Sequence, residues 1–438
     1  MGLGVGSVLA SGCGAGEKTG NAANEWLVGA YLSLSGAQTQ FGVDTKEGIE
    51  LAVEEVNKAG GAKNKQIKVL FEDDKSKPDE ANQKVLQLID RDKVVALLGE
   101  IQSAISKAGG IVANRKQIPM ITPSSTNPDV TKVGEYVFRV CFVDDFQGRM
   151  GAEFCVKTLG KKKIGLLFAE DDLYSSGLAG EFKKAVQELG GEIVLEKKFT
   201  KAETNFTTYV TELKSANPEI IYAPVYYNQM VPIARQARSE GIPGEMFVGG
   251  DGWSGADYKE LEGAYFTDHY APDVPWEKSK AFVAAYKAKF KRDPSSLAAM
   301  GYDAALVLAD AMKRAKEDTP KGIRDAIAET KNFAGATGII TIDADRNAIK
   351  PAVIVQIKGG TTTYKAVVGP GADTLLGGKA PVIEGAPSAS ASAAPSASGS
   401  AEPAASGSAA ASASAAPSAS ASAGPKASAA PKASAAPK

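Results

Sequence analysis

The sequence predicts an α/β protein of two doubly wound lobes, each built around a parallel β-sheet. Three observations lead to this fold class. Short apolar runs typical of buried strands alternate with amphipathic stretches typical of helices, a pattern expected of parallel sheets with helices on both faces. The alternation forms two series along the chain, over 25–125 and over 162–253. Finally, 44% of the 438 residues are hydrophobic, which is enough for two cores of ordinary size.

The first series opens with a strand-like run within 25–36, where Trp26, Val28 and Ala30 alternate with other residues. An amphipathic helix is expected over 43–61, because its apolar side chains recur at the spacing of one helix face. These side chains are Ile49, Ala52, Val53 and Val56. Further strands are expected within 66–74, 94–100 and 117–125, and further helices within 78–93 and from Ser103.

The second series repeats the pattern. Strands are expected within 162–172, 192–199, 219–227 and 245–253, and helices after Ser175, within 205–216 and within 229–241. In sheets of this kind the loops after the carboxyl ends of the strands carry the binding site. Here those loops are rich in hydroxyl, aromatic and acidic side chains and contain neither His nor Cys. Their chemistry is that of recognition rather than of catalysis.

Composition excludes several other classes of function. The net charge of −1 argues against nucleic acid or an anionic membrane surface as the main partner. The chain has three Cys without a Cys-x-x-Cys pair and one His, His269, so neither a zinc site nor His-based catalysis is predicted. We find no nucleophile paired with a base and no cofactor motif, and so we predict no enzyme. The sequence contains no run of eighteen or more apolar residues, and so we predict no membrane span.

The two ends of the chain differ from the folded part in composition. Residues 1–24 are rich in Gly, Ala and Ser, and a small-residue run precedes Cys13, which resembles a bacterial lipoprotein signal with Cys13 as the lipidated residue. A flexible Gly-rich leader is the alternative. Residues 371–385 are expected to form a linker. The Ala/Ser/Pro/Lys segment 386–438 is predicted to be a disordered spacer, or alternatively a weakly basic segment that touches cell-wall polymer.

The order of motifs resembles the type I periplasmic solute-binding proteins of the branched-chain amino acid branch. The matching stretches are "GIELAVEEVNKAGG", "FEDDKSKPDEA", "ITPSSTNPDVT", "FRVCFVDDFQG", "YVTELKSANPEIIY" and "RQARSEG". The resemblance implies two lobes joined by three crossovers, which close on a ligand. It divides the chain into lobe 1 at 25–143 and 274–345 and lobe 2 at 144–273 and 346–370.

The resemblance also implies a subsite for the α-carboxylate of the ligand in the loops after two strands of lobe 1. The positions that match are Ser103, Ser125 and Thr126, with Ser124 beside them. The chemistry fits, because a helix N-terminus offers unpaired N–H groups and hydroxyls add neutral donors. From the residues alone, Ser103 and Thr126 could equally be an ordinary helix cap and part of an Asn-Pro turn.

The facing lobe should supply an acid and two tyrosines, and lobe 1 one further aromatic side chain. Asp251, in "GGDGWSG", matches the family's acid for the ligand ammonium, although the leucine/isoleucine/valine binders carry the longer Glu there; a Gly-Asp-Gly turn is the alternative. Tyr226, Tyr174 and Phe41 match aromatic contacts around the ligand, with Tyr227 able to exchange roles with Tyr226. Such rings would line an apolar cavity with few polar groups.

The sequence therefore predicts an extracytoplasmic substrate-binding component of an ABC importer, with a small amino acid as ligand and Leu, Ile or Val favoured. The expected partners are ABC permease subunits, and a monomer is expected, with contact to the membrane only through lipid on Cys13. A sensor built on the same lobes, or a binder of an amide, urea or another small carboxylate, is the alternative.

Overall fold

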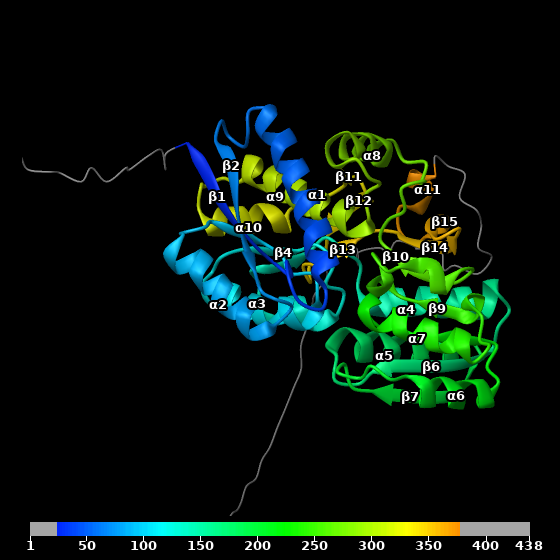
Figure 1. Ribbon diagram of the computed structural model, residues 1–438. Helices are drawn as coiled ribbons and strands as arrows, with labels where there is room; N and C mark the ends of the chain where they lie inside the picture. Colours follow the sequence, from blue (N-terminus) through cyan, green and yellow to red (C-terminus); the bar gives the residue numbers. More distant parts are fainter. Residues whose placement is uncertain (1–23, 377–438) are drawn as a thin grey trace, which may run out of the picture. The chain divides into compact units, whose positions relative to one another are not determined.

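Two β-sheets form the cores of the two lobes. The computed structural model describes residues 24–376 (Figure 1), so Cys13, most of the predicted leader and the predicted tail at 386–438 lie outside the described residues. The fold class is confirmed, since each sheet contains a run of parallel strands and is flanked by helices. None of the described helices is long and apolar enough to cross a membrane.

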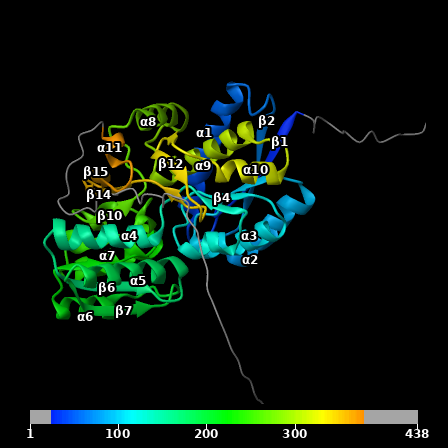
Figure 2. The same cartoon turned by 180° about the vertical axis from the view of Figure 1, so that it is seen from behind.

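The first sheet is parallel throughout, in the order β2-β1-β3-β4-β5. Its strands are β1 (Glu25–Leu32), β2 (Gln66–Asp73), β3 (Ala96–Leu98), β4 (Met120–Thr122) and β5 (Val137–Arg139). The helices of this lobe are α1 (Thr39–Lys58), α2 (Pro78–Leu86), α3 (Ser103–Arg115), α8 (Glu277–Phe290), α9 (Ser296–Arg314) and α10 (Pro320–Ala328). Helices α2 and α3 lie side by side in both views (Figures 1 and 2). Helices α1 and α9 pack so closely that a Cβ on Gly48 would stand 1.9 Å from the Ala298 carbonyl oxygen.

The second sheet has the order β15-β14-β10-β9-β8-β6-β7. Its strands are β6 (Lys163–Ala169), β7 (Glu192–Phe199), β8 (Ile220–Tyr222), β9 (Phe247–Gly249), β10 (Tyr265–Asp268), β14 (Ala352–Lys358) and β15 (Thr361–Val368). Its helices are α4 (Asp144–Glu153), α5 (Leu173–Glu188), α6 (Thr207–Ala216) and α7 (Tyr227–Ser239). The last two strands are antiparallel additions at one edge, which the alternation of strands and helices did not predict.

Short segments complete the architecture. A small antiparallel sheet contains β11 (Phe333–Gly335), β12 (Gly338–Ile342) and β13 (Ala348–Ile349). Short 3₁₀-helices occur at Pro128–Val133, Gly244–Met246, Asp251–Trp253 and Tyr258–Leu261, and π-helical turns at Gln87–Arg91 and Phe154–Thr158.

The chain passes between the lobes three times, after β5, after β10 and after β13. The first passage lies between the end of β5 at Arg139 and the start of α4 at Asp144. Tyr270 already packs among side chains of lobe 1, close to Phe282, so the second passage lies a few residues before 273. Strand β13 still pairs with β12, which places the third passage after Ile349 rather than after 345.

Lobe 2 continues beyond residue 370, where the predicted linker begins. Helix α11 (Ala372–Leu375) follows β15, and its Leu375 is only 2% exposed. Leu375 and Leu376 belong to the same apolar cluster as Val355 and Val367 of the sheet. The start of the predicted linker is therefore folded onto the lobe through Leu376, because these two leucines can bury apolar surface there.

Candidate functional site

Two loops of lobe 1 meet where the sequence predicts the carboxylate subsite. Ser103 is the first residue of α3, not its cap, and the first turn of that helix carries no acid. The Ser103 hydroxyl accepts a hydrogen bond from the Asn127 backbone N–H at 3.3 Å, which joins the loop after β3 to the loop after β4. Asn127 in turn caps the following 3₁₀ turn through its side chain. The start of α3 is thus left with backbone donors of the kind that bind anions.

The three hydroxyls of the second loop differ in their surroundings. The Ser124 and Thr126 hydroxyl oxygens are buried and have no hydrogen-bond partner in the described part of the chain. The Ser125 hydroxyl instead pairs with Ser106 at 2.5 Å and contacts the Glu100 carbonyl oxygen at 3.3 Å. Ser124 and Thr126 are therefore available to a ligand, whereas the Ser125 side chain holds the loop in place.

Arg139, for which the sequence analysis predicted no role, holds this loop by hydrogen bonds to its backbone. Its fully buried guanidinium donates to the Ser125 carbonyl at 2.6 Å and to the Asn127 carbonyl at 2.8 Å. Burial lowers the pKa of Arg139. One side chain thus bonds the carbonyls of the residues on either side of Thr126.

Asp251 sits in the turn directly after β9. Its neighbours must be glycines, because a Cβ on Gly250 or Gly252 would lie 2.6 or 2.8 Å from atoms of Tyr174. The Asp251 carboxylate accepts from the Gln147 amide at 2.9 Å and faces His269 Nε2 at 3.1 Å. Asp251 therefore lies in a Gly-Asp-Gly turn, and its buried carboxylate is held there by two side chains.

His269 is an unexpected member of the site. Burial lowers its pKa, although the hydrogen bond to Asp251 acts in the opposite direction. The neutral ring then donates from Nε2 to Asp251, and the other ring nitrogen, Nδ1, has no partner among the described residues. No local pattern marks this histidine, since its role arises only where the end of β10 meets the turn after β9.

Asp144 is a second buried carboxyl close to Asp251. It is the first residue of α4, and neither of its oxygens has a hydrogen-bond partner in the described structure. Burial, and then the negative charge of Asp251, raises its pKa well above the ordinary value. The Thr126 hydroxyl lies near enough to act against this shift, although no hydrogen bond of normal geometry joins the two groups. One turn along α4, Gln147 also has an unpartnered amide oxygen.

The predicted aromatic side chains gather beside these acids. Tyr226 stacks on Tyr174 with ring centroids 4.8 Å apart, and Phe41 meets Tyr226 edge-on at 5.9 Å. Phe41 also contacts Tyr227 at 5.0 Å, so both tyrosines of the pair touch it. The Tyr174 hydroxyl accepts from the Gly252 backbone at 2.9 Å, and a backbone hydrogen bond from Ser103 acts on Tyr226. The rings thus connect the Asp251 turn to the start of α3.

The unpaired polar atoms around this site divide into two chemical kinds. Lobe 1 presents donors, namely the Ser124 and Thr126 hydroxyls and the start of α3. Asp144, Gln147 and His269 present acceptors, beside the Asp251 carboxylate. Buried polar groups are normally paired, so this division points to a small ligand with an anionic and a cationic end.

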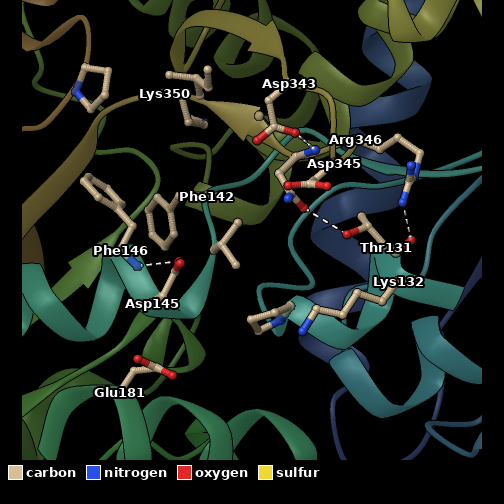
Figure 3. A pocket seen from close by; sticks show the side chains of 16 residues that line it. Thr131, Lys132, Phe142, Asp145, Phe146, Glu181, Asp343, Asp345, Arg346 and Lys350 are labelled. Carbon is tan, nitrogen blue, oxygen red and sulfur yellow. Dashed lines mark hydrogen bonds between the residues drawn. The ribbon is translucent and has the colours of Figure 1, made fainter. Parts of the chain in front are cut away.

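A separate cavity of about 590 Å³ lies near the first and third passages between the lobes. Figure 3 shows Asp145 and Phe146 at the start of α4 on one side and Asp343, Asp345 and Arg346 on the other. None of the predicted ligand-binding residues lines this cavity. Within 24–376, no group of three His, Cys, Asp or Glu side chains is placed to hold a metal ion. Cys141 and Cys155 are buried free thiols.

Comparison with known proteins gives a consistent family. The sequence profile described as "Periplasmic binding protein" matches residues 25–362. The crystal structure of a leucine binding protein from Thermotoga maritima is 36% identical, with a TM-score of 0.74, over 79% of this chain and 99% of that chain.

Two further relatives extend the comparison. A branched-chain amino acid transporter substrate binding protein from Streptococcus pneumoniae, solved in complex with isoleucine, is 34% identical with a TM-score of 0.74, over 79% of this chain and 100% of that one. The Leu/Ile/Val-binding protein homolog 3 of Brucella melitensis is 29% identical over 334 residues, which cover 74% of this chain and 89% of the relative.

Proposed function

The chain belongs to the periplasmic binding protein family, and from this premise we propose that it is the extracytoplasmic substrate-binding component of an ABC importer. Its proposed ligand is a small α-amino acid held between the two lobes, with Leu, Ile or Val favoured. The names of two relatives support that preference, since one is a leucine binding protein and another was solved with isoleucine. The family places the protein outside the cytoplasm.

The observation that carries the proposal is the division of unpaired polar atoms into donors and acceptors. In the proposed complex the ligand carboxylate lies at the start of α3 and accepts from the hydroxyls of Ser103, Ser124 and Thr126, because the Ser103 backbone N–H already acts on Tyr226. These donors are neutral or dipolar, so they bind an anion without bringing a cation into the site. Ser125 is assigned to holding the loop, because its hydroxyl already has two contacts within lobe 1.

The ligand ammonium is assigned to Asp251 and Asp144. A carboxylate buried without a cationic partner costs several kcal/mol, and Asp144 has no partner of its own. An ammonium placed between the two carboxyls would offset their mutual repulsion. Phe41, Tyr174 and Tyr226 would then surround the aliphatic side chain of the ligand, as the stacked and edge-on ring contacts suggest.

Further parts of the proposal concern assembly. ABC permease subunits are the proposed partners, and a monomer is the proposed working form. We also propose that lipid on Cys13 anchors the protein to a membrane; that residue lies outside the described part.

Isothermal titration calorimetry of the full chain tests the proposal. The protein is first unfolded and refolded to remove any retained ligand and is then titrated with Leu, Ile, Val, Phe, acidic and basic amino acids, acetamide and urea. We expect micromolar or tighter binding of an aliphatic amino acid, and loss of that binding in Asp251→Asn. Asp257→Asn is the matched control, because Asp257 is exposed on the segment that follows the Asp251 turn. Binding of an amide or urea that survives Asp251→Asn would contradict the amino-acid assignment.

A further inference from the structure

Two buried acids lie behind the carboxylate subsite, and neither contacts the proposed ligand. Asp74 follows β2 and Glu100 follows β3, and the intervening strand β1 ends beside Ser33. All three side chains are 0% exposed. The Ser33 hydroxyl lies 3.0 Å from Asp74 Oδ1 and 2.8 Å from Glu100 Oε1. Three neighbouring strands thus bring two carboxyls to a single hydroxyl.

The Ser33 hydroxyl contacts a carboxyl oxygen of each acid, but it has only one hydrogen to donate. If both acids are ionised, one of these two contacts therefore contains no proton. The hydroxyl oxygen accepts from the Gln102 side-chain amide at 2.9 Å. Its own hydrogen can point to only one of the two carboxyl oxygens. The remaining lone pair faces the other acid, and that contact is a hydrogen bond only if that acid carries a proton. Otherwise two buried oxygens without a hydrogen between them face each other, at a cost in free energy.

We infer that Asp74 and Glu100 share one proton through the Ser33 hydroxyl, and that this proton positions the lobe 1 half of the ligand site. The inference deepens the proposed function and rests on it for its binding consequence. Glu100 is a positioning residue, since it acts on the ligand only through the loops that it holds.

The electrostatic surroundings favour retention of the proton. Burial raises the pKa of Asp74 to about 7 and raises that of Glu100 well above its ordinary value. The negative charge of Asp74 raises the pKa of Glu100 further. The other charged groups that act on Asp74 are Asp73 and Glu80, and both are acidic. The phenols of Tyr31, on β1, and Tyr226, at the start of α7, also face Glu100. The charged side chains that act most strongly on the two acids are therefore themselves acidic.

Glu100 connects this pair directly to both ligand loops. Its carboxyl accepts from the backbone N–H of Gln102, the cap of α3, at 2.6 Å. Its carbonyl accepts from the Thr122 hydroxyl at 2.5 Å and from the Ser125 hydroxyl at 3.3 Å. Loss of the shared proton would place two negative charges at Ser33 and push the Glu100 side chain away. The start of α3 and the Ser124–Thr126 loop would then lose a common support.

The consequence is a decline in affinity at alkaline pH. If only the singly protonated pair supports the loops, the dissociation constant rises about tenfold for each pH unit above the titration of the pair. The ligand's own ammonium also titrates at high pH, but its contribution is the same for every variant of the protein and cancels in a comparison.

The direct test needs no ligand. The side-chain carboxyl carbons of Asp and Glu are followed by ¹³C NMR from pH 4 to 9 in the ligand-free full chain, with Asp74→Asn and Glu100→Gln used to assign the two signals. We expect the wild-type pair to retain one proton at pH 6. Ionisation of both carboxyls below pH 5 would overturn the inference, and it would do so whatever ligand the protein binds.

The second test concerns positioning. Glu100→Gln replaces the acid by a neutral amide that can donate to the Ser33 hydroxyl at every pH. Affinity for the bound amino acid is measured from pH 6 to 9 in wild type, Glu100→Gln and Glu80→Gln; the last neutralises a neighbouring acid that does not touch Ser33. The titrations of Asp144 and of the ligand ammonium are common to all three proteins, so the comparison is made relative to Glu100→Gln. We expect the affinities of wild type and Glu80→Gln, each divided by that of Glu100→Gln, to fall at least tenfold between pH 7 and 9. Equal pH dependence in all three would overturn the positioning role. Should Glu100→Gln fail to fold, Asp74→Asn serves in the same comparison.

Discussion

Asp144 shows most clearly, among single residues, how the site depends on a ligand. Its carboxyl is 0% exposed, lies near Asp251 and has no hydrogen-bond partner among the described residues. A ligand ammonium would supply the missing charge. We predict that Asp144→Asn weakens amino-acid binding by about 2–5 kcal/mol, the range for removing one member of a buried charge pair. The matched control is Asp145→Asn, because Asp145 is the next residue and is exposed; calorimetry that finds equal losses in both variants would contradict the prediction.

The raised pKa of Asp144 predicts proton release on binding. In the free protein this carboxyl retains its proton to a higher pH than usual, because burial and Asp251 disfavour its charge. The ligand ammonium favours the charged form, so binding expels the proton and affinity rises with pH up to the raised pKa. Calorimetry in two buffers with different ionisation enthalpies should report this release below that pKa. Asp144→Asn should abolish it, and unchanged release in the variant would assign the proton to another group.

The sequence anticipated one half of the site better than the other. The rule that sites lie after the carboxyl ends of parallel strands predicts the loops that hold Ser103 and Thr126, and the family resemblance singles out these two residues within them. Gln147 and His269 are not predicted, because neither stands in a marked loop or motif, and their role appears only where α4 and the end of β10 approach Asp251. Which hydroxyl of the Ser124–Thr126 loop is free also depends on Ser106 and Arg139, residues whose spacing predicts no contact with the loop.

At the scale of elements, the parallel strands were predictable and the edge of the second sheet was not. Strands β1 to β4 and β6 to β9 each fall within a predicted apolar run. Strands β14 and β15 form an antiparallel hairpin that joins the sheet beside β10. The sequence of a hairpin does not determine which sheet edge the hairpin joins. The choice of edge depends on the apolar surface that the rest of the lobe leaves uncovered.

The third passage between the lobes contains a buried lysine that gives an element-scale prediction. Lys350 is 2% exposed and donates to the Thr337 hydroxyl at 2.6 Å, and that hydroxyl donates to Asp303. Burial lowers the pKa of Lys350 from 10.5 to about 8. Between these values the unfolded chain binds a proton that the folded chain does not, so this group makes stability rise with pH, by up to about 3 kcal/mol.

The measurement is the difference in unfolding free energy between wild type and Lys350→Met from pH 8 to 10. We expect wild type to gain stability relative to Lys350→Met across this window. Lys358→Met, which removes an exposed lysine at the end of β14, should show no such difference. Parallel pH profiles for wild type and Lys350→Met would show that Lys350 is not the titrating group.

Helix α11 yields a second prediction at this scale. Leu375 is 2% exposed within the apolar cluster of lobe 2, and truncating a buried leucine costs about 2–5 kcal/mol. We predict a loss of that size for Leu375→Ala in urea unfolding monitored by circular dichroism. Thr374→Ala, at an exposed position of the same helix, should change stability by less than about 0.5 kcal/mol. A negligible effect of Leu375→Ala would mean that α11 does not stabilise the lobe.

At the scale of the whole molecule, we expect contacts between the lobes to add to the affinity for the proposed ligand. Gln38, which precedes α1, donates from its side-chain amide to Asn228 of α7 at 3.1 Å. The Gln40 backbone N–H donates to the Tyr227 hydroxyl at 3.3 Å in the same region. Such contacts add to the affinity only if they form more completely in the ligand-bound state than in the free state.

A double-mutant cycle isolates that contribution. The ligand affinities of wild type, Gln38→Ala, Asn228→Ala and the double variant are measured by calorimetry. A partly exposed amide–amide hydrogen bond should give a coupling free energy of about 0.5–1 kcal/mol in binding. The same cycle in unfolding of the ligand-free protein should give a smaller coupling, because the contact helps closure rather than the cores of the lobes. A coupling of zero in binding would mean that closure on the ligand does not use this contact, whereas equal couplings in binding and unfolding would mean that the contact persists without ligand.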